Sequence, residues 1–291
     1  MSSEGRGTGM TTSYEDVVKA RRDGDDGVYR ASISPDWALS YAVHGGILMS
    51  LATRTMSQAL EQVGAHVDPL VISAFFLSAA EPGEFELRTE VVRAGRGMST
   101  AQVSVMQSDA SGRARERMRA VATFGDLEAA RPLHRTSPPP ELPDPDECIP
   151  AHTPRDAEER WPFLQHLDMR IDPATATWAQ GKPSGAGEMR AWVRRASSRP
   201  VDAFGLPFLL DAMPPVSFDL GIGGWAPTLE MTTHIRALPE PGWLRMRIRS
   251  ENLTQGFLEE DAQIWDSTGR LVAQSRQLAG VRLEPPAPVN S

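Results

Sequence analysis

A carboxylate in an otherwise apolar segment is the first candidate for chemistry in this sequence. Asp211 lies near the end of the run from Ala203 to Pro215, whose apolar residues and closing prolines predict a buried helix that stops before Pro214. An ionised group in such a segment is costly unless a polar partner answers it. Asp211 is therefore either a paired structural residue or a carboxylate presented to a cleft, where burial can raise its pKa and let it act as a base.

The tripeptide His44-Gly45-Gly46 is a second candidate. It precedes segment 47–63, which has the apolar spacing of a buried helix. Glycines at a helix start let a substrate approach the backbone, and the free N–H groups there can polarise a carbonyl. We therefore expect the N–H of Gly46, with Gly45 beside it, to serve as an oxyanion donor. A simple tight turn is the alternative, and His44 is expected to orient or support rather than to act as a base.

Length, charge and cysteine content narrow the class of protein. The 291 residues carry a net charge of −8, which argues against a nucleic acid or an anionic membrane as partner. A single cysteine, Cys148, excludes an intramolecular disulfide and fits a reducing cytoplasm. No apolar run is long enough for a transmembrane helix, and no zinc spacing, phosphate-binding loop or serine-hydrolase elbow occurs. We expect a soluble cytoplasmic protein with no metal and no cofactor.

The chain is expected to divide into two halves. Residues 1–12 are rich in glycine, serine and threonine and predict a disordered tail. Residues 127–160 are proline-rich and predict a linker without a core of its own. Between and after them, residues 13–126 and 161–291 each contain a helical segment followed by strand-like runs.

An internal repeat relates the two halves. Glu81-Pro82-Gly83 recurs 159 positions later, and the turn 109–113 recurs 157 positions later as 266–270. A helix followed by antiparallel strands, occurring twice, predicts an α+β fold. In it, each half forms an antiparallel sheet wrapped around a central helix.

With the halves aligned, the chain resembles a known family from about residue 27 to 283, the linker excepted. The resemblance is to the TesB-like (type II) acyl-CoA thioesterases of the thioesterase-like superfamily, whose fold is the double hotdog. The first half carries it in His44-Gly45-Gly46, Ser73-Ala74-Phe75-Phe76-Leu77, Glu81-Pro82-Gly83 and Val92-Arg93-Ala94-Gly95-Arg96. The second half carries it in Leu210-Asp211-Ala212, Pro227-Thr228-Leu229-Glu230 and the run from Trp265 to Gln277.

The resemblance implies an activity and three site residues. The family hydrolyses acyl-CoA thioesters with a water held by an Asp, a Ser or Thr and a Gln, and these positions fall on Asp211, Thr228 and Gln277. The family commonly has an Asp-His pair shortly after the Thr, where this chain has Glu230-Met231. Thr232 or Thr233 therefore remains an alternative hydroxyl. Strand alternation alone leaves open whether Gln277 faces a site or solvent.

The repeat bears on the number of sites. Thr228 corresponds to Pro69 and Gln277 to Ala120, so the first half lacks these polar groups. A set required only by the fold would recur in both halves, and we therefore expect one active site per chain, built from the second half.

The expected function is that of an acyl-CoA thioesterase in fatty acid metabolism, with acyl-CoA as substrate. One alternative is an acyl-CoA hydratase or dehydratase, which would need an Asp/His pair within one half. His234 is the nearest histidine to Asp211 in the sequence that lies on a strand-like run. The other alternative is a non-catalytic acyl-CoA-binding protein. Sheet edges and an outer sheet face need cover, so we also expect a homo-oligomer.

Overall fold

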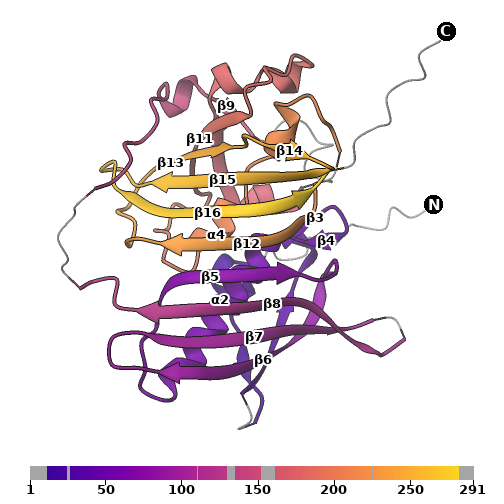
Figure 1. Cartoon of the computed structure of the whole chain (residues 1–291), viewed down its shortest axis with the longest axis vertical. Helices are drawn as coiled ribbons and strands as arrows, with labels where there is room; N and C mark the ends of the chain where they lie inside the picture. Colours follow the sequence, from indigo (N-terminus) through magenta and orange to yellow (C-terminus); the bar gives the residue numbers. More distant parts are fainter. Residues whose placement is uncertain are drawn as a thin grey trace, which may run out of the picture.

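The computed structural model describes residues 12–24, 27–109, 111–129, 135–151, 161–224 and 226–281. Within them, one long antiparallel sheet runs through both halves of the chain in the order β1-β2-β6-β7-β8-β5-β12-β16-β15-β13-β11-β10-β9, and β14 pairs with β15 (Figure 1). The prediction of an α+β fold with antiparallel sheets is confirmed. The predicted tail, apart from Thr12, lies outside the described residues.

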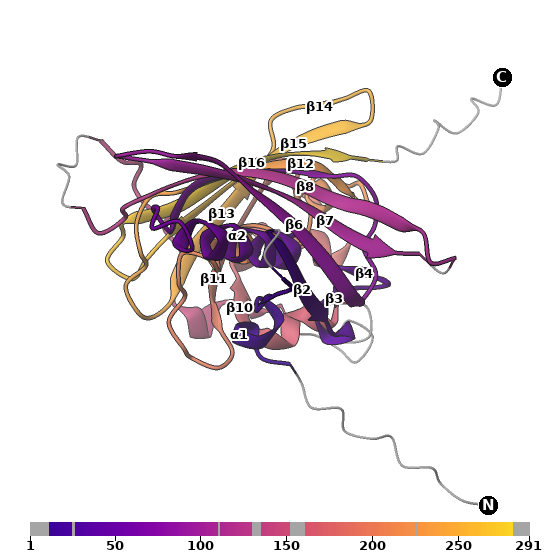
Figure 2. The same cartoon turned by 90° about the horizontal axis from the view of Figure 1, so that it is seen from below.

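The first half supplies one long helix and the strands that curve over it. Its elements are α1 (Tyr14–Val17), β1 (Arg21–Arg22), β2 (Val28–Ile33), η1 (Pro35–Trp37), β3 (Ala38–Leu39), β4 (Ala42–Val43), α2 (Gly45–Glu61), β5 (Asp68–Phe76), β6 (Gly83–Ala94), β7 (Ser99–Ser108) and β8 (Ala114–Gly125). Figure 2 shows α2 lying beneath the curved sheet. Helix α2 packs on β5, β6, β7 and β8 and buries Ile47, Leu51, Met56 and Leu60 completely. Such burial of large side chains is the main stabilisation of this half.

The second half supplies the other side of the sheet. Its elements are η2 (Pro145–Glu147), β9 (Ile149–Pro150), η3 (Pro162–His166), β10 (Leu167–Ile171), η4 (Pro173–Thr175), η5 (Thr177–Gln180), β11 (Glu188–Arg195), α4 (Leu206–Leu210), η6 (Val216–Phe218), β12 (Thr228–Ile235), β13 (Leu244–Arg249), β14 (Leu253–Thr254), β15 (Phe257–Trp265) and β16 (Leu271–Gly280). No helix in the described part of the chain is long and apolar enough to cross a bilayer.

Helix α4 is shorter than the segment Ala203–Pro215 predicts. It has five residues, ends at Leu210 and leaves Asp211 as its C-cap. Pro207 fits the first turn of a helix, whereas Pro214 and Pro215 cannot extend one. The central position of the second half is therefore filled by a single buried turn, which packs against α2.

The two halves join through β5 and β12. These strands pair antiparallel, with Glu230 opposite Phe75 and His234 opposite Val71. Because the pairing makes the sheets of the two halves continuous, α2 and α4 lie under one sheet and their ends can meet.

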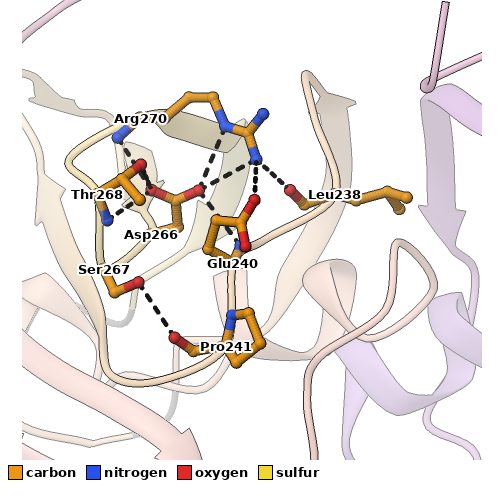
Figure 3. Close-up of polar contacts among 7 residues, drawn as sticks. All are labelled: Leu238, Glu240, Pro241, Asp266, Ser267, Thr268 and Arg270. Carbon is orange, nitrogen blue, oxygen red and sulfur yellow. Dashed lines mark hydrogen bonds and ion pairs between the residues drawn. The ribbon is translucent and has the colours of Figure 1, made fainter.

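The internal repeat is visible in two hairpin turns. Oδ1 of Asp266 accepts hydrogen bonds from the backbone N–H groups of Thr268 and Arg270, and its Oδ2 accepts one from Glu240 (Figure 3). Asp109 binds the backbone of Ser111 and Arg113 in the same way. The matched sequence motifs therefore form matched turns.

The described part of the proline-rich segment lies along the second half. The backbone carbonyl of Pro143 accepts a hydrogen bond of 2.8 Å from Nε1 of Trp192, and that of Ser137 accepts one of 3.0 Å from Trp265. Strand β9 pairs with β10 at the edge of the sheet. These contacts hold the segment against the outer strands.

Candidate active site

Asp211 faces the first turn of α2. Its Oδ2 accepts a hydrogen bond of 2.6 Å from the N–H of Gly46, and Nδ1 of His44 lies 3.6 Å from the same oxygen. The Asp211 side chain is 14% exposed. Sequence reasoning assigned these residues to separate halves and separate motifs, and the structure brings them together at the contact between α2 and α4.

Burial sets the charges at this contact. Burial raises the pKa of Asp211 to about 7, and the hydrogen bond from Gly46 limits the rise. Burial lowers the pKa of His44 to about 3, so that its imidazole is neutral at pH 7. The His44 ring packs on Phe163 and Phe208, with centroids 4.2 and 5.3 Å away. Asp211 therefore titrates near neutrality beside an uncharged histidine.

The two glycines are required by close packing. A Cβ at position 46 would lie 2.8 Å from Cα of Phe208 and 2.9 Å from Cβ of Asp211. A Cβ at position 45 would lie 3.0 Å from Oδ2 of Asp211. The predicted oxyanion donor, the N–H of Gly46, is directed at Asp211 here, whereas the N–H of Gly45 has no partner among the described residues.

Thr228 and Gln277 form a second pair on the inner face of the sheet. Oγ1 of Thr228 donates a hydrogen bond of 2.8 Å to Oε1 of Gln277. Gln277 lies on the same face of β16 as the buried residues Ser275 and Ala279, whereas its neighbours Arg276 and Leu278 are exposed, so it faces inward. A bulge after Thr228 places this residue opposite Ala279 and leaves Leu229 exposed. The bulge is what turns Thr228 to the inner face.

Glu260 contacts the Thr228–Gln277 pair through Gln277, and sequence reasoning missed it. Its Oε1 accepts a hydrogen bond of 2.8 Å from Nε2 of Gln277, and its Oε2 accepts one of 3.0 Å from the N–H of Val216. Burial raises the pKa of Glu260 to about 7, and the nearby charge of Asp211 adds to the rise. The sequence did indicate its burial, because alternation along the strand places Glu260 on the same face as the apolar residues Leu258, Ala262 and Ile264, which are buried.

The alternative hydroxyls lie in other surroundings. Thr232 forms hydrogen bonds with Ser73 and Glu230 in and beside the β5–β12 pair. Thr233 is completely buried, and its Oγ1 has no partner among the described residues. Of the three threonines, Thr228 is the one whose hydroxyl contacts Gln277.

The part of the chain that the structure describes contains no cluster of metal-ligating side chains. No group of three or more His, Cys, Asp or Glu side chains gathers there in a way that could hold an ion. The groups that the site does offer are the carboxyls of Asp211 and Glu260, the Thr228 hydroxyl, the Gln277 amide and the backbone N–H groups of α2.

Comparison with known proteins identifies the class and then the family. A solved structure from Thermobifida fusca, described as a proposed thioesterase II, is 28% identical and covers 94% of this chain and 100% of that one, with a TM-score of 0.82. A hot dog fold protein of unknown function from Alicyclobacillus acidocaldarius is 20% identical, covers 95% and 100%, and has a TM-score of 0.79. The protein is a two-domain hotdog of the thioesterase II type, as the sequence predicted.

Models of the acyl-CoA thioesterase N-terminal and C-terminal domains match residues 33–125 and 145–281. An uncharacterized protein of Mycobacterium tuberculosis is 30% identical over an alignment of 273 positions, and the match covers 87% of this chain and 91% of the relative. The chain belongs to the acyl-CoA thioesterase family.

Proposed function

We propose that this protein hydrolyses an acyl-CoA thioester by direct attack of a water molecule held by Asp211, Thr228 and Gln277. The observation that carries the proposal is the hydrogen bond from Thr228 to Gln277 on the inner face of the sheet. It lies beside Glu260, which accepts a hydrogen bond from Gln277 and whose pKa the charge of Asp211 helps to raise. Burial raises the pKa of the Asp211 carboxyl itself to about 7. A carboxylate with a pKa near the working pH is well suited to general base catalysis.

The hydroxyl and the amide orient the water. The Thr228 proton is directed at Gln277, so the Thr228 oxygen is left to accept a hydrogen bond from the water. Asp211 accepts the other water proton as the water oxygen bonds to the thioester carbon. The C–O π electrons move onto the carbonyl oxygen, which becomes an oxyanion.

The first turn of α2 is suited to stabilise that oxyanion. We propose the N–H of Gly45 as the donor, because the end of a helix concentrates free N–H groups and positive potential. The N–H of Gly46, the donor expected from the sequence, is taken by Asp211. Collapse of the intermediate then breaks the C–S bond. The CoA thiolate takes up the proton held by Asp211, and the products are CoA and a carboxylic acid.

The test is release of free thiol by the purified full chain from acyl-CoAs of graded length. We expect turnover with at least one of them, and a loss of 100-fold or more in kcat in Asp211→Asn, which keeps the shape of the side chain but cannot take the proton. Asp261→Asn is the matched control, since Asp261 pairs with Arg276 on the exposed side of β15. Tight acyl-CoA binding without turnover by the parent would instead support a binding protein.

Hydration or dehydration of an acyl thioester is a second candidate, which one observation favours. His44 lies 3.6 Å from Asp211, which supplies the Asp/His pair that such chemistry needs, though from different halves of the chain. It leaves Thr228 and Gln277 without a role. Loss of the conjugated absorbance of an enoyl-CoA without release of thiol would support this candidate over hydrolysis.

We also propose a homo-oligomer. Phe75, Val121 and Leu278 are 52%, 44% and 40% exposed on the central strands β5, β8 and β16. Apolar side chains on the middle of an outer sheet face are suited to contact a second copy. Sedimentation analysis tests this, and a monomer at micromolar concentration would contradict it.

A reducing cytoplasmic setting is proposed as well, and with it a role in fatty acid metabolism. The lone Cys148 is buried and has no second cysteine with which to form a disulfide within the chain. Fractionation of cells that express the protein tests the location.

A further inference from the structure

A buried carboxyl group, that of Glu260, contacts Gln277, one of the residues proposed to hold the water. Glu260 is 5% exposed, and both of its oxygens are used: one accepts from Nε2 of Gln277, the other from the backbone N–H of Val216. Burying an acidic side chain is costly unless a lysine or an arginine pairs with it. Among the described residues, no lysine or arginine pairs with Glu260. The position therefore calls for an explanation other than stability.

The repeat shows that the fold does not need these polar groups. Glu260 pairs with Gln277 across β15 and β16, and the matching pair across β7 and β8 is Val103 with Ala120. Val103 and Ala120 are buried at 1% and 0% exposure. The same strand geometry is thus built with an apolar pair in the first half, whereas the second half buries a carboxyl and an amide.

We propose that Glu260 is a positioning residue for hydrolysis: it holds the Gln277 side chain with Nε2 toward β15 and Oε1 toward Thr228. The inference rests on the proposed function, because it assigns to Glu260 the orientation of two groups that hold the water. Glu260 itself acts through Gln277.

The donors around Glu260 explain why a carboxylate is needed. Val216 offers a backbone N–H that cannot be turned, and Gln277 offers its Nε2. Only a group with two acceptor oxygens satisfies both donors at once. A glutamine at position 260 would have to direct its own amide nitrogen at one of them. The least costly solution is rotation of the Gln277 amide, which removes the acceptor from Thr228 and frees the Thr228 hydroxyl to turn toward the water.

The charge on Glu260 ties this orientation to pH. Asp211 at the end of α4 and Asp261 on β15 are the acidic groups that act on Glu260, and both raise its pKa, while burial is the largest cause of the rise. His44, beside Asp211, stays neutral because burial lowers its pKa to about 3. Protonated Glu260 would become a donor toward Gln277, with the same effect on the amide as the Gln substitution. Full activity then requires two ionised carboxyls, Asp211 and Glu260.

The experiment compares Glu260→Gln and Glu260→Val, the latter being the residue of the first repeat, with Glu84→Gln at an exposed position of β6 as control. We expect both variants to lose 10-fold or more in kcat while KM changes by less than 3-fold and the melting temperature at pH 8 does not fall. As the pH falls below about 7, log(kcat/KM) of the parent is expected to decrease by more than one unit per pH unit, because two carboxyls become protonated. In Glu260→Gln the slope returns to one.

Two results would overturn the inference. One is a Glu260→Gln variant with the kcat and pH profile of the parent, in a protein whose activity is lost in Asp211→Asn; the proposed hydrolysis would then stand and the role of Glu260 would not. The other is a loss of kcat that follows a fall in melting temperature with the acidic slope unchanged, which is the signature of a structural role. A parent that releases no thiol removes both proposals.

Discussion

The N–H of Gly46 donates a hydrogen bond of 2.6 Å to Oδ2 of Asp211, which joins residues 165 positions apart. Gly46 belongs to the long helix of the first half, and Asp211 is the C-cap of the short helix of the second. The candidate base is therefore held by the half of the chain that lacks the polar pair. The proposed site in the second half therefore depends on a residue of the first half.

Gly46→Ala tests the close contact of the two helices. The added Cβ would lie 2.8 Å from Cα of Phe208 and from the carbonyl oxygen of Pro207, backbone atoms that cannot move alone. We expect the free energy of unfolding to fall by about 1–3 kcal/mol, the usual cost of overpacking. We also expect kcat to fall 10-fold or more, because Asp211 is displaced. Urea unfolding and thiol release measure the two effects.

Gly97→Ala is the control for this substitution. A Cβ at position 97 meets nothing within 4 Å, so its effect on stability and turnover should be small. If Gly46→Ala were as stable and active as Gly97→Ala, the contact between α2 and α4 would not be as tight as described.

Thr228→Val separates the three candidate hydroxyls. Valine keeps the shape of the side chain but cannot bind Gln277 or a water, so kcat should fall about 100- to 1,000-fold, the range found for removal of one preorganised hydrogen bond. Thr232→Val is the comparison, because its hydroxyl contacts Ser73 and Glu230 instead. Steady-state kinetics that showed the larger loss in Thr232→Val would transfer the water-holding role to that residue.

Much of the fold was accessible from sequence because it depends on local patterns. The segment 47–63 predicted helix α2 to within two residues at each end, and the repeated turns at Asp109 and Asp266 occur as expected. The second central helix was predicted too long, since the apolar residues from Ala203 onward suggested several turns. Buried loop residues show the same composition, and only the prolines at 214 and 215 limited the helix.

The site was harder to predict from the sequence, because it depends on which face of the sheet each side chain points to. Alternation left Gln277 undecided, and only the pairing of β16 fixes it on the inner face. Thr228 is turned inward by a bulge, which shifts the strand phase and has no clear sequence signal. Glu260 was overlooked because its partners, Gln277 and Val216, are 17 and 44 positions away.

The activity should follow the ionisation of Asp211. Burial raises the pKa of this carboxyl to about 7, and only its ionised form can take a proton from water. We expect kcat/KM to rise as the pH increases through about 7 and then to level off. Burial lowers the pKa of His44 to about 3, so its protonation should not affect the pH profile of kcat/KM above pH 5. Thioester absorbance from pH 5.5 to 9 gives the profile without depending on thiol ionisation. Activity that is unchanged down to pH 5.5 would argue against Asp211 as the base.

The pH dependence of the free energy of unfolding should also reflect the ionisation of Glu260. Burial raises its pKa from the usual 4.5 to about 7, so between these pH values the folded protein holds a proton that the unfolded chain has released. The contribution of Glu260 to stability is therefore full below pH 4.5 and is lost as the pH rises through 7. A shift of this size corresponds to about 3 kcal/mol in the free energy of unfolding.

Glu260→Gln removes this titration, since an amide stays neutral throughout. We expect the free energy of unfolding of Glu260→Gln, relative to the parent, to increase by up to about 3 kcal/mol between pH 5 and pH 8. Urea unfolding at the two pH values gives the difference, and the opposing contribution of His44 cancels because it is common to both proteins. Glu84→Gln, at an exposed position of β6, serves as the comparison. Parent and Glu260→Gln curves that run parallel over this range would mean that Glu260 is ionised at little cost. Its carboxylate would then be stabilised by the N–H of Val216 and the amide of Gln277 alone, and the pH dependence of the site would belong to Asp211.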